Sequence, residues 1–466
     1  MDLQTAINIP WKRLLRLALE RGGSYADLFF EQTIYHDITL RDGQVNAAGT
    51  HSDSGLGIRV LTGDQTGYAF TESVAARDME RAAQTAAFIA DSSNPAPQSV
   101  RLHTIKTKNL YPVTDQWNDI SPERKIPFLQ EMNDLVFGAD KRVKKVIARL
   151  SDTTTFIRFY DSEGTGFTDL RPMASLSVSC IMEAGGKTET ASCSRSFRIG
   201  GEFLQHSLIE ELAAEVVART AFQFSAVQPK GGEMPVVMAA GGSGILLHEA
   251  IGHAFEADFI RKSISIFSGR LGTRVCAPGI NIIDDGTIPF NRGSINIDDE
   301  GTPGQKTYMV TDGILTSFLH DRISAAQFGV PATGNGRRES FRFMPLPRMR
   351  ATYMENGPST EESLIASIKK GLYVDTFSNG QVQIGAGDFT FYVKSGYLIE
   401  KGKLTRPVKD VNIIGNGPAA LADIKGVANN FIMDNGTWTC GKEQSCPVSC
   451  GMPTVLVGSL TVGGGA

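Results

Sequence analysis

The length of the chain is the first constraint on its fold. With 466 residues it is too long to fold around one ordinary hydrophobic core, so we expect two or three domains. Hydrophobic residues make up 41% of the chain and charged residues 21%, which is typical of a globular protein. Such a chain can bury large cores without disulfide bonds. Its six cysteines do not resemble the disulfide framework of a small secreted protein.

The charge balance excludes one class of partner. Lysine and arginine total 46 against 50 acidic residues, for a formal net charge of -4, and no long basic run is present. We therefore expect no nucleic-acid partner. The N-terminus lacks the cationic start and apolar core of a signal peptide, and apolar runs elsewhere are too short to span a membrane. A reducing, cytoplasmic location without membrane contact is the expectation.

Hydrophobic periodicity and turn residues divide the chain into three parts. Residues 1–98 predict an N-terminal α/β domain, residues 99–230 a central α/β segment, and residues 231–466 a β-rich domain. Helices are expected over residues 11–20, 77–90, 122–137 and 208–222, and strands over 28–32, 36–40, 57–60, 66–70 and 143–159. A linker rich in proline and serine is expected at 91–99, and residues 187–199 are expected to be polar and exposed.

The third part contains hairpin signals around Asp312-Gly313 and around Lys401-Gly402. A single conspicuous helix is expected near its start. The predicted fold class is therefore α+β, with N-terminal α/β domains followed by an antiparallel, β-rich C-terminal domain that carries this helix.

The conspicuous helix carries the residues with the clearest chemistry. A short apolar strand at 236–239 leads through Gly241-Gly242-Ser243-Gly244 into an apolar helix with His248, Glu249 and His253. In zinc hydrolases, histidine imidazoles bind the metal and a neighbouring glutamate polarises the bound water. A single histidine on an apolar helix is more often a core residue, but here two of seven histidines flank a glutamate. We predict that both histidines are metal ligands and that Glu249 is the general base.

The spacing of the two histidines requires a distorted helix. Residues five apart point about 140° apart around a regular helix, whereas residues four apart differ by only about 40°. A π-type widening of the helix would bring both histidines to one face. A helix that ends near Gly252, with His253 turned back, would do the same. Either solution places Gly252 within the site.

A catalytic zinc needs a third protein ligand. Glu256, Asp258 and His320 are candidates close to the motif, and the thiols of Cys440, Cys446 and Cys450 are candidates near the C-terminus. Cys440 stands beside Gly441 and Lys442, in a turn-like setting where the neighbouring cation favours the thiolate. Cys446 and Cys450 lack the Cys-x-x-Cys spacing of a structural zinc site. The residues alone leave the choice of third ligand open.

Several segments resemble the TldD/PmbA family, also called modulator of DNA gyrase. The resemblance covers roughly residues 20–460 and is most specific between 234 and 455. It rests on the glycine-rich approach with His-Glu-x-x-x-His and on residues 57–60, 284–289, 292–303, 331–340, 395–400, 440–442 and 447–454. In this family the TldD type carries the His-Glu-x-x-x-His motif and the PmbA (TldE) type lacks it, so this chain resembles the catalytic TldD type.

The resemblance implies a metallopeptidase that hydrolyses unfolded or short peptides with metal-bound water as the nucleophile. It implies zinc held by His248, His253 and Cys440, with Glu249 as the base, and a dimer that pairs a TldD subunit with a PmbA-type partner. The sequence departs from the family pattern at Ser449, where a glycine is usual, and in a shorter spacer after Lys442. Cys446 and Cys450 are additional thiols, so an exchange with Cys440 stays open.

Three further questions stay open at this level. The loop at 333–338 offers Asn335, Arg337 and Arg338 as substrate-binding residues, since guanidinium groups bind carboxylates in a bidentate manner. The alternative is a loop that is only braced through Glu339. Histidine and thiolate ligands suit iron as well as zinc. A non-catalytic regulatory or binding subunit of a partner such as a topoisomerase is the alternative function.

Overall fold

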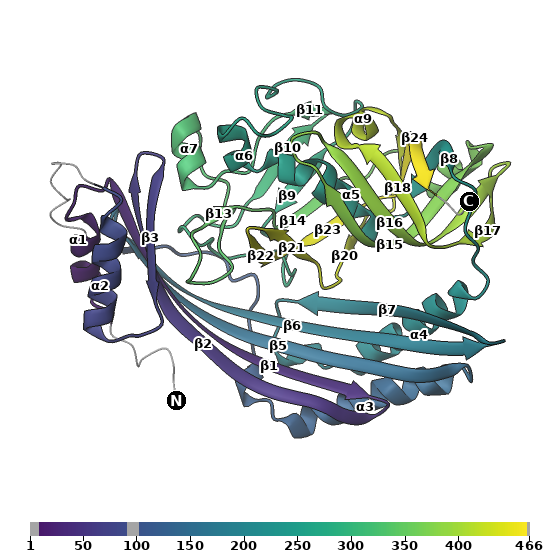
Figure 1. The fold of residues 1–466 in the computed structure, drawn as a ribbon, viewed down its shortest axis with the longest axis horizontal. Helices are drawn as coiled ribbons and strands as arrows, with labels where there is room; N and C mark the ends of the chain where they lie inside the picture. The colour runs from purple at the N-terminus through teal and green to yellow at the C-terminus, as the bar shows by residue number, and fades with distance from the viewer. Residues whose placement is uncertain (1–8, 91–101, 464–466) are drawn as a thin grey trace.

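The computed structural model describes residues 9–90 and 102–463, and it confirms the α+β class (Figure 1). One large twisted sheet forms the N-terminal half, with helices on its outer face. The β-rich C-terminal region lies over its inner face (Figure 1). The predicted linker at 91–99 lies outside the described residues.

The large sheet contains the strands of both N-terminal segments. Its order is β3-β2-β1-β5-β6, with β7 antiparallel to β6 and the short β4 parallel to it. Residues 28–32 and 36–40, expected to be separate strands, belong to one long strand, β1. The strand bounds are β1 (Tyr25–Arg41), β2 (Gln44–Thr62), β3 (Gln65–Thr71), β4 (His103–Thr104), β5 (Val143–Asp161), β6 (Thr165–Ala184) and β7 (Lys187–Phe197). The predicted limits at residues 98 and 230 stay a prediction.

Four helices cover the sheet, close to the positions that periodicity predicts. They are α1 (Trp11–Leu19), α2 (Ala76–Ala87), α3 (Pro122–Ala139) and α4 (His206–Gln223). The first two pack on β1 and β2 through a core that includes Leu14, Ile58 and Ala83. The other two pack on β5 and β6 through Leu129, Val178 and Leu212. Residues 187–199 were expected only to be polar and exposed, but residues 187–197 form the edge strand β7.

The C-terminal region is built from two larger sheets and two short hairpins. The first sheet has the order β11-β10-β9-β14-β23-β20, and the second has the order β15-β8-β24-β18-β16-β17. The second sheet closes on itself, because β15 also pairs with β16. Both predicted hairpins are present, one between β10 and β11 and one between β16 and β17.

The strands of this region are β8 (Gly232–Met238), β9 (Ile282–Asp285), β10 (Lys306–Thr311), β11 (Ile314–Leu315), β12 (Gly336–Arg337), β13 (Leu346–Pro347), β14 (Ala351–Met354), β15 (Lys370–Val382), β16 (Asp388–Glu400), β17 (Lys403–Val408), β18 (Val411–Asn416), β19 (Ile424–Val427), β20 (Ile432–Asp434), β21 (Thr439–Lys442), β22 (Gln444–Pro447), β23 (Ser449–Met452) and β24 (Val455–Gly463). Its helices are α5 (Ile245–Leu247), α6 (Ala257–Arg261), α7 (Arg322–Phe328), α8 (Glu361–Ala366) and α9 (Gly417–Ala422).

The largest core surrounds the predicted metal-binding helix. Leu246, Ile251 and Phe255 pack there with side chains from both C-terminal sheets. The hairpin of β21 and β22 lies between this core and the large sheet (Figure 1). All six cysteines are free thiols. None of the helices in residues 9–90 and 102–463 has the length and apolar character needed to cross a membrane.

Candidate metal centre

A glycine turn fixes the start of the helix that carries the two histidines. The chain leaves β8 and reverses at Gly241, whose φ of 91° favours glycine. At Gly244, a Cβ atom would lie 2.4 Å from the backbone nitrogen of Gly451 on β23. Only glycine allows this close approach, so the turn anchors the helix against the first C-terminal sheet.

The helix is widened where the motif requires it. Residues His248–Gly252 form a π-helical turn, followed by a 3-10 turn at His253–Phe255. The two imidazole rings lie 5.0 Å apart between centroids. Of the two solutions that the spacing left open, the structure shows the π-type widening. Gly252 is packed closely, since a Cβ atom there would lie 2.1 Å from Sδ of Met349.

Cys440 is the third member of the cluster. The ligand atoms of His248, His253 and Cys440 all lie within 4.8 Å of one another, and all three residues are buried. The Sγ atom of Cys440 is 3.2 Å from Nε2 of His253. The π turn lies near the start of the C-terminal region and β21 lies near its end. The fold thus brings their side chains together.

The donor set fits a catalytic zinc. Two imidazoles and a thiolate are three protein ligands, which leaves one position open for water or substrate. Burial raises the pKa of the Cys440 thiol, but the positive charge of His248 and hydrogen bonds from both histidines lower it to about 4. The thiolate is the form that binds metal. Among the described residues, Nδ1 of His248 is buried and has no hydrogen-bond partner, which agrees with a role of this residue in metal binding.

The other candidate ligands have different partners. Asp258 lies 2.7 Å from Nζ of Lys442, and Nδ1 of His320 lies 3.2 Å from the hydroxyl of Ser324. Sγ of Cys446 is 3.6 Å from the guanidinium group of Arg348, and Cys450 is buried on β23. The structure does not bring these four side chains into the cluster of the two histidines.

Glu256 holds His253 rather than a metal. Its carboxylate lies 2.9 Å from Nδ1 of His253, so Nε2 faces Cys440. Lys442 lies 3.1 Å from the same carboxylate. Burial raises the pKa of Glu256, but the charges of Lys442 and His253 lower it to about 2. Carboxylates that orient ligating histidines are usual around zinc, because they fix the ring and increase its basicity.

Sequence reasoning missed these supporting contacts. Cys440 and Lys442 are two residues apart on β21, so both side chains point to the same face of the strand. Arg348 donates to the carbonyl oxygens of Cys440 and Gln444 at 2.8 Å each, and its Nε lies 3.7 Å from Glu256. Side chains two residues apart on a strand share a face, so the Cys-Gly-Lys segment could have indicated that Lys442 lies on the same side as Cys440. Nothing local identifies Arg348.

Glu249 lies on the π turn beside the cluster and is partly exposed. Burial raises its pKa, and the positive charges of His248 and His253 oppose that shift. The backbone of Gly380 on β15 passes close by, where a Cβ atom would lie 3.5 Å from Cγ of Glu249. A carboxylate in this position is suited to accept and return a proton.

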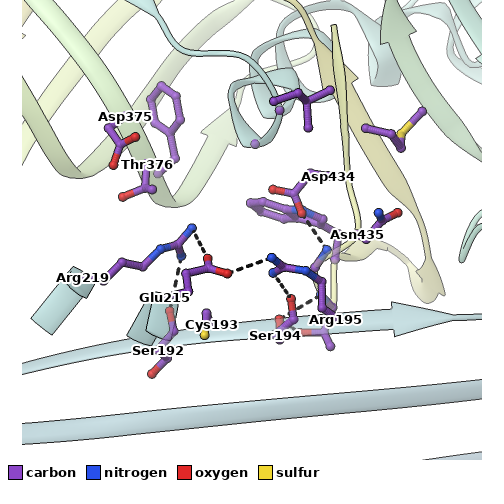
Figure 2. A pocket seen from close by; sticks show the side chains of 18 of the residues that line it. Ser192, Cys193, Ser194, Arg195, Glu215, Arg219, Asp375, Thr376, Asp434 and Asn435 are labelled. Atoms are coloured by element: carbon purple, nitrogen blue, oxygen red, sulfur yellow. Dashed lines mark hydrogen bonds and ion pairs between the residues drawn. The ribbon is translucent and has the colours of Figure 1, made fainter. Parts of the chain in front are cut away.

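A cavity of about 620 Å³ is lined in part by the glycine turn that precedes the histidine helix (Figure 2). It lies between β7 with α4 on one side and the C-terminal region on the other. His248, His253 and Cys440 do not line it. Gly241 and Gly242, at the start of the histidine helix, do line it, and so does Trp438, two residues before Cys440. Figure 2 shows Arg195 bonded to Glu215 at its floor, at 2.8 Å.

The loop at 333–338 is extensively hydrogen-bonded. The amide of Asn335 donates to Asp284 at 2.7 Å and to the carbonyl oxygen of Arg348 at 3.0 Å. Arg337 donates to the carbonyl oxygen of Pro447, and Arg338 donates to that of Asp299. The carboxylate of Glu339 accepts from the backbone nitrogen of Ser445 on β22 and forms no ion pair with a described arginine. Substrate binding by Asn335, Arg337 and Arg338 stays a prediction.

Comparison with known proteins finds matches to one family along nearly the whole chain. Residues 26–90, 115–222 and 231–464 match domain 1, the central domain and the C-terminal domain of the PmbA/TldA metallopeptidases. A Haemophilus influenzae protein named metalloprotease TldD homolog is 38% identical over 100% of this chain and 97% of its own. A Saccharolobus solfataricus protein named zinc metalloprotease TldD homolog is 29% identical over 97% of this chain and 99% of its own.

Solved structures show the same fold. A Thermotoga maritima protein described as a modulator of a DNA gyrase superposes with a TM-score of 0.77 at 20% identity, over 97% of this chain and 99% of that chain. TldE from Thermococcus kodakarensis gives a TM-score of 0.75 at 18% identity, over 97% and 100%. Together with the His-Glu-x-x-x-His motif, these matches show that the chain belongs to the TldD/PmbA metallopeptidase family, as a member of the TldD type.

Proposed function

We propose that this chain is a zinc-dependent peptidase that hydrolyses unfolded or short peptides. The observation that carries the proposal is the convergence of His248, His253 and Cys440 beside the carboxylate of Glu249. The names of the relatives support a metallopeptidase. The alternative, a regulatory subunit without catalysis, is not favoured. The ligand set does not by itself separate zinc from iron.

The chain's own residues supply positioning and proton transfer. Bound zinc contributes Lewis acidity and lowers the pKa of water at its open position. Glu249 accepts the proton of the attacking water on its carboxylate and delivers it to the leaving amine. Glu256 holds the His253 ring in one orientation, and Lys442 keeps Glu256 ionised. Arg348 holds the β21–β22 hairpin in register, so that the Cys440 thiolate stays on the histidine side.

Two edge strands support an extended peptide as the substrate. In the described parts of the chain, β6 is the only strand paired with β7 and β23 the only one paired with β20, although the end of β7 also meets Asn435 and Asn291 through Ser196 and Phe197. Residues of both strands line the cavity of about 620 Å³ (Figure 2). Extended peptides bind to strand edges through their backbones, which gives affinity with little dependence on side chains. This arrangement favours unfolded segments over folded domains, because only an extended chain offers its backbone groups.

A free edge on β2 supports a dimer. β3 pairs with residues 56–62 of β2. Residues 44–55 of β2 therefore pair with β1 on one side but with no strand on the other side within the described chain. Residues 44–52 are all exposed, and Val45 is 45% exposed. Long exposed strand edges invite pairing with another chain. The partner is a PmbA/TldE-type paralogue or a second copy of this chain.

Peptide cleavage with and without a chelator tests the proposed function. The purified chain, alone and together with a PmbA/TldE-type partner, is incubated with an unstructured peptide of mixed sequence and with a folded control domain. We expect cleavage of the peptide, loss of cleavage with the chelator, and recovery when zinc is added. Chelator-insensitive cleavage, or no cleavage with the partner present, would contradict the proposal.

A further inference from the structure

A second cavity, of about 250 Å³, lies between the inner face of the large sheet and the C-terminal region. Strands β1, β5 and β6 form one wall. The loops before β10 and β14, together with β12 and the two residues after it, form the other. Thr439 and Pro447 of the β21–β22 hairpin also line it. Thr439 and Cys440 are adjacent on a strand, so this cavity is on the opposite face of β21 from the metal centre.

The lining has an excess of positive charge. Six arginines line the cavity, against three carboxylates. Each carboxylate is already hydrogen-bonded. Asp299 pairs with Arg171, Glu339 accepts from the backbone of Ser445, and Glu31 accepts from the backbone of Phe341. Burial also raises the pKa of Glu31 to about 7, which reduces its negative charge.

Four of the arginines form no ion pair with any described carboxylate: Arg198, Arg292, Arg337 and Arg350. Their exposed fractions are 6%, 8%, 3% and 2%. Three of them donate only to neutral oxygen atoms, for example Arg292 to Ser196 at 2.6 Å and Arg350 to the carbonyl of Gly334 at 2.9 Å. The guanidinium group of Arg198 forms no hydrogen bond with a described residue, and its carbon lies 5.5 Å from the ring centroid of Tyr111.

Burying cations without counter-ions is unfavourable, and these groups also repel one another. Burial lowers the pKa of Arg198 to about 10, and the charges of Arg171 and Arg337 lower it as well. Burial and the charge of Arg337 lower the pKa of Arg350 to about 9. Nε of Arg198 and Nη2 of Arg350 are buried donors without a hydrogen-bond partner in the described chain. The cavity thus has both unpaired charge and unpaired donors.

We propose that this cavity binds a small oxyanion, held by the guanidinium groups of Arg198, Arg292, Arg337 and Arg350. A carboxylate or phosphate supplies the negative charge and the acceptors that the described residues do not, and guanidinium groups bind both in a planar, bidentate manner. The anion is either free in solution or the carboxylate of a bound peptide. The inference does not depend on the proposed peptidase activity, because binding is measured without cleavage.

Arg198 is the residue to change. No hydrogen bond to another side chain is lost in Arg198→Met, and a cation without a counter-ion is removed, so the variant is expected to fold. Arg198→Lys keeps the charge as a conservative variant. Arg149→Gln, in a surface ion pair with Asp37, is the matched control because its side chain is 56% exposed.

The first measurement is thermal unfolding of the full chain with increasing inorganic phosphate, at constant ionic strength set with chloride. We expect a saturable rise in Tm for the wild type and for Arg149→Gln. In Arg198→Met, binding is expected to be at least about tenfold weaker, as for loss of one charge-assisted pair. Arg198→Lys is expected to fall between them. Phosphate bound at the metal centre would raise the Tm of Arg198→Met as much as it raises the Tm of the wild type.

The second measurement compares one unstructured peptide with a free and an amidated C-terminus. Binding is measured by titration calorimetry in a Glu249→Gln background, so that no cleavage intervenes. A preference of about tenfold for the free carboxylate that disappears with Arg198→Met supports the proposal and identifies the peptide as the anion's source. A phosphate effect that depends on Arg198 supports it with a free anion as the source. If neither response depends on Arg198, the proposal is wrong.

Discussion

The Sγ atom of Cys440 lies 3.2 Å from Nε2 of His253, although 187 residues separate them along the chain. Two structural features bring these atoms together. The π turn at His248–Gly252 rotates His253 toward His248, and Arg348 holds the hairpin that carries Cys440 through its backbone oxygens. The centre is therefore assembled from both ends of the C-terminal region and depends on the folding of that whole region.

Glu249→Gln separates metal binding from proton transfer. The amide has nearly the same shape but cannot accept the proton, so peptide cleavage is expected to fall about 10²–10⁴-fold. Metal content is expected to match the wild type, because Glu249 is not among the three clustered ligands. Steady-state cleavage and metal analysis on one preparation check both expectations. Cleavage within twofold of the wild type would remove Glu249 as the base.

Glu256→Gln tests how His253 is held. The amide oxygen can still accept a hydrogen bond from Nδ1, but the negative charge is lost. Zinc affinity is expected to fall about 10–100-fold, the usual effect of changing a carboxylate behind a ligating histidine. Competition with a chromophoric chelator measures it. Glu80→Gln, in a surface pair with Arg13, is the control, and equal affinity in both variants would contradict the account.

Gly252→Ala tests the packing of the π turn. The new Cβ atom would overlap Sδ of Met349, which is fully buried, so the helix or Met349 must move. We expect a loss of about 1–3 kcal/mol in the free energy of unfolding, as for other overpacked sites. Gly138→Ala in α3 is the control, because nothing lies within 4 Å of its new atom. It should be neutral or slightly stabilising. Urea unfolding curves of equal midpoint for both variants would contradict the packing described here.

We predict that the burial of His320 makes part of the free energy of unfolding depend on pH. Burial against neighbours such as Phe328 lowers its pKa from 6.5 to about 4. Between these values the unfolded chain binds a proton at His320 and the folded chain does not. The stability from neutral His320 is therefore complete above pH 6.5 and is lost as the pH falls toward 4. Urea unfolding at pH 7 and pH 5 should show a smaller loss for His320→Gln than for the wild type, and equal losses would contradict this.

Local pattern was sufficient for the helices and for the core of the site. The period of apolar residues predicts α1 to α4, and the five-residue step between His248 and His253 predicts a distorted helix, of which the π turn was one of two possible forms. These features depend on residues close in sequence. The long strand β1 was less visible, because its apolar residues pack in two separate cores, Leu28 and Phe30 in one and Ile38 and Leu40 in the other, with mostly polar residues between them.

Long-range contacts could not be predicted from pattern. The pair of Glu256 with Lys442 and the bonds of Arg348 to the hairpin join segments that are far apart in the chain. The four unpaired arginines come from β12 and from loops after β7, β9 and β13, and only the folded chain places them around one cavity. Arg337 was a candidate for substrate binding in the sequence, but the other three arginines look like ordinary surface cations there.

Metal analysis of the cysteine variants tests the central claim most directly. The wild type, Cys440→Ala, Cys446→Ala and Cys450→Ala are purified identically, checked for folding by circular dichroism, and analysed for zinc and iron. The account predicts about one zinc per chain in the wild type, Cys446→Ala and Cys450→Ala, because a catalytic site of this kind holds one ion. It predicts loss of most of that metal in Cys440→Ala. An unchanged metal content in folded Cys440→Ala would contradict the assignment of His248, His253 and Cys440 as the ligand set.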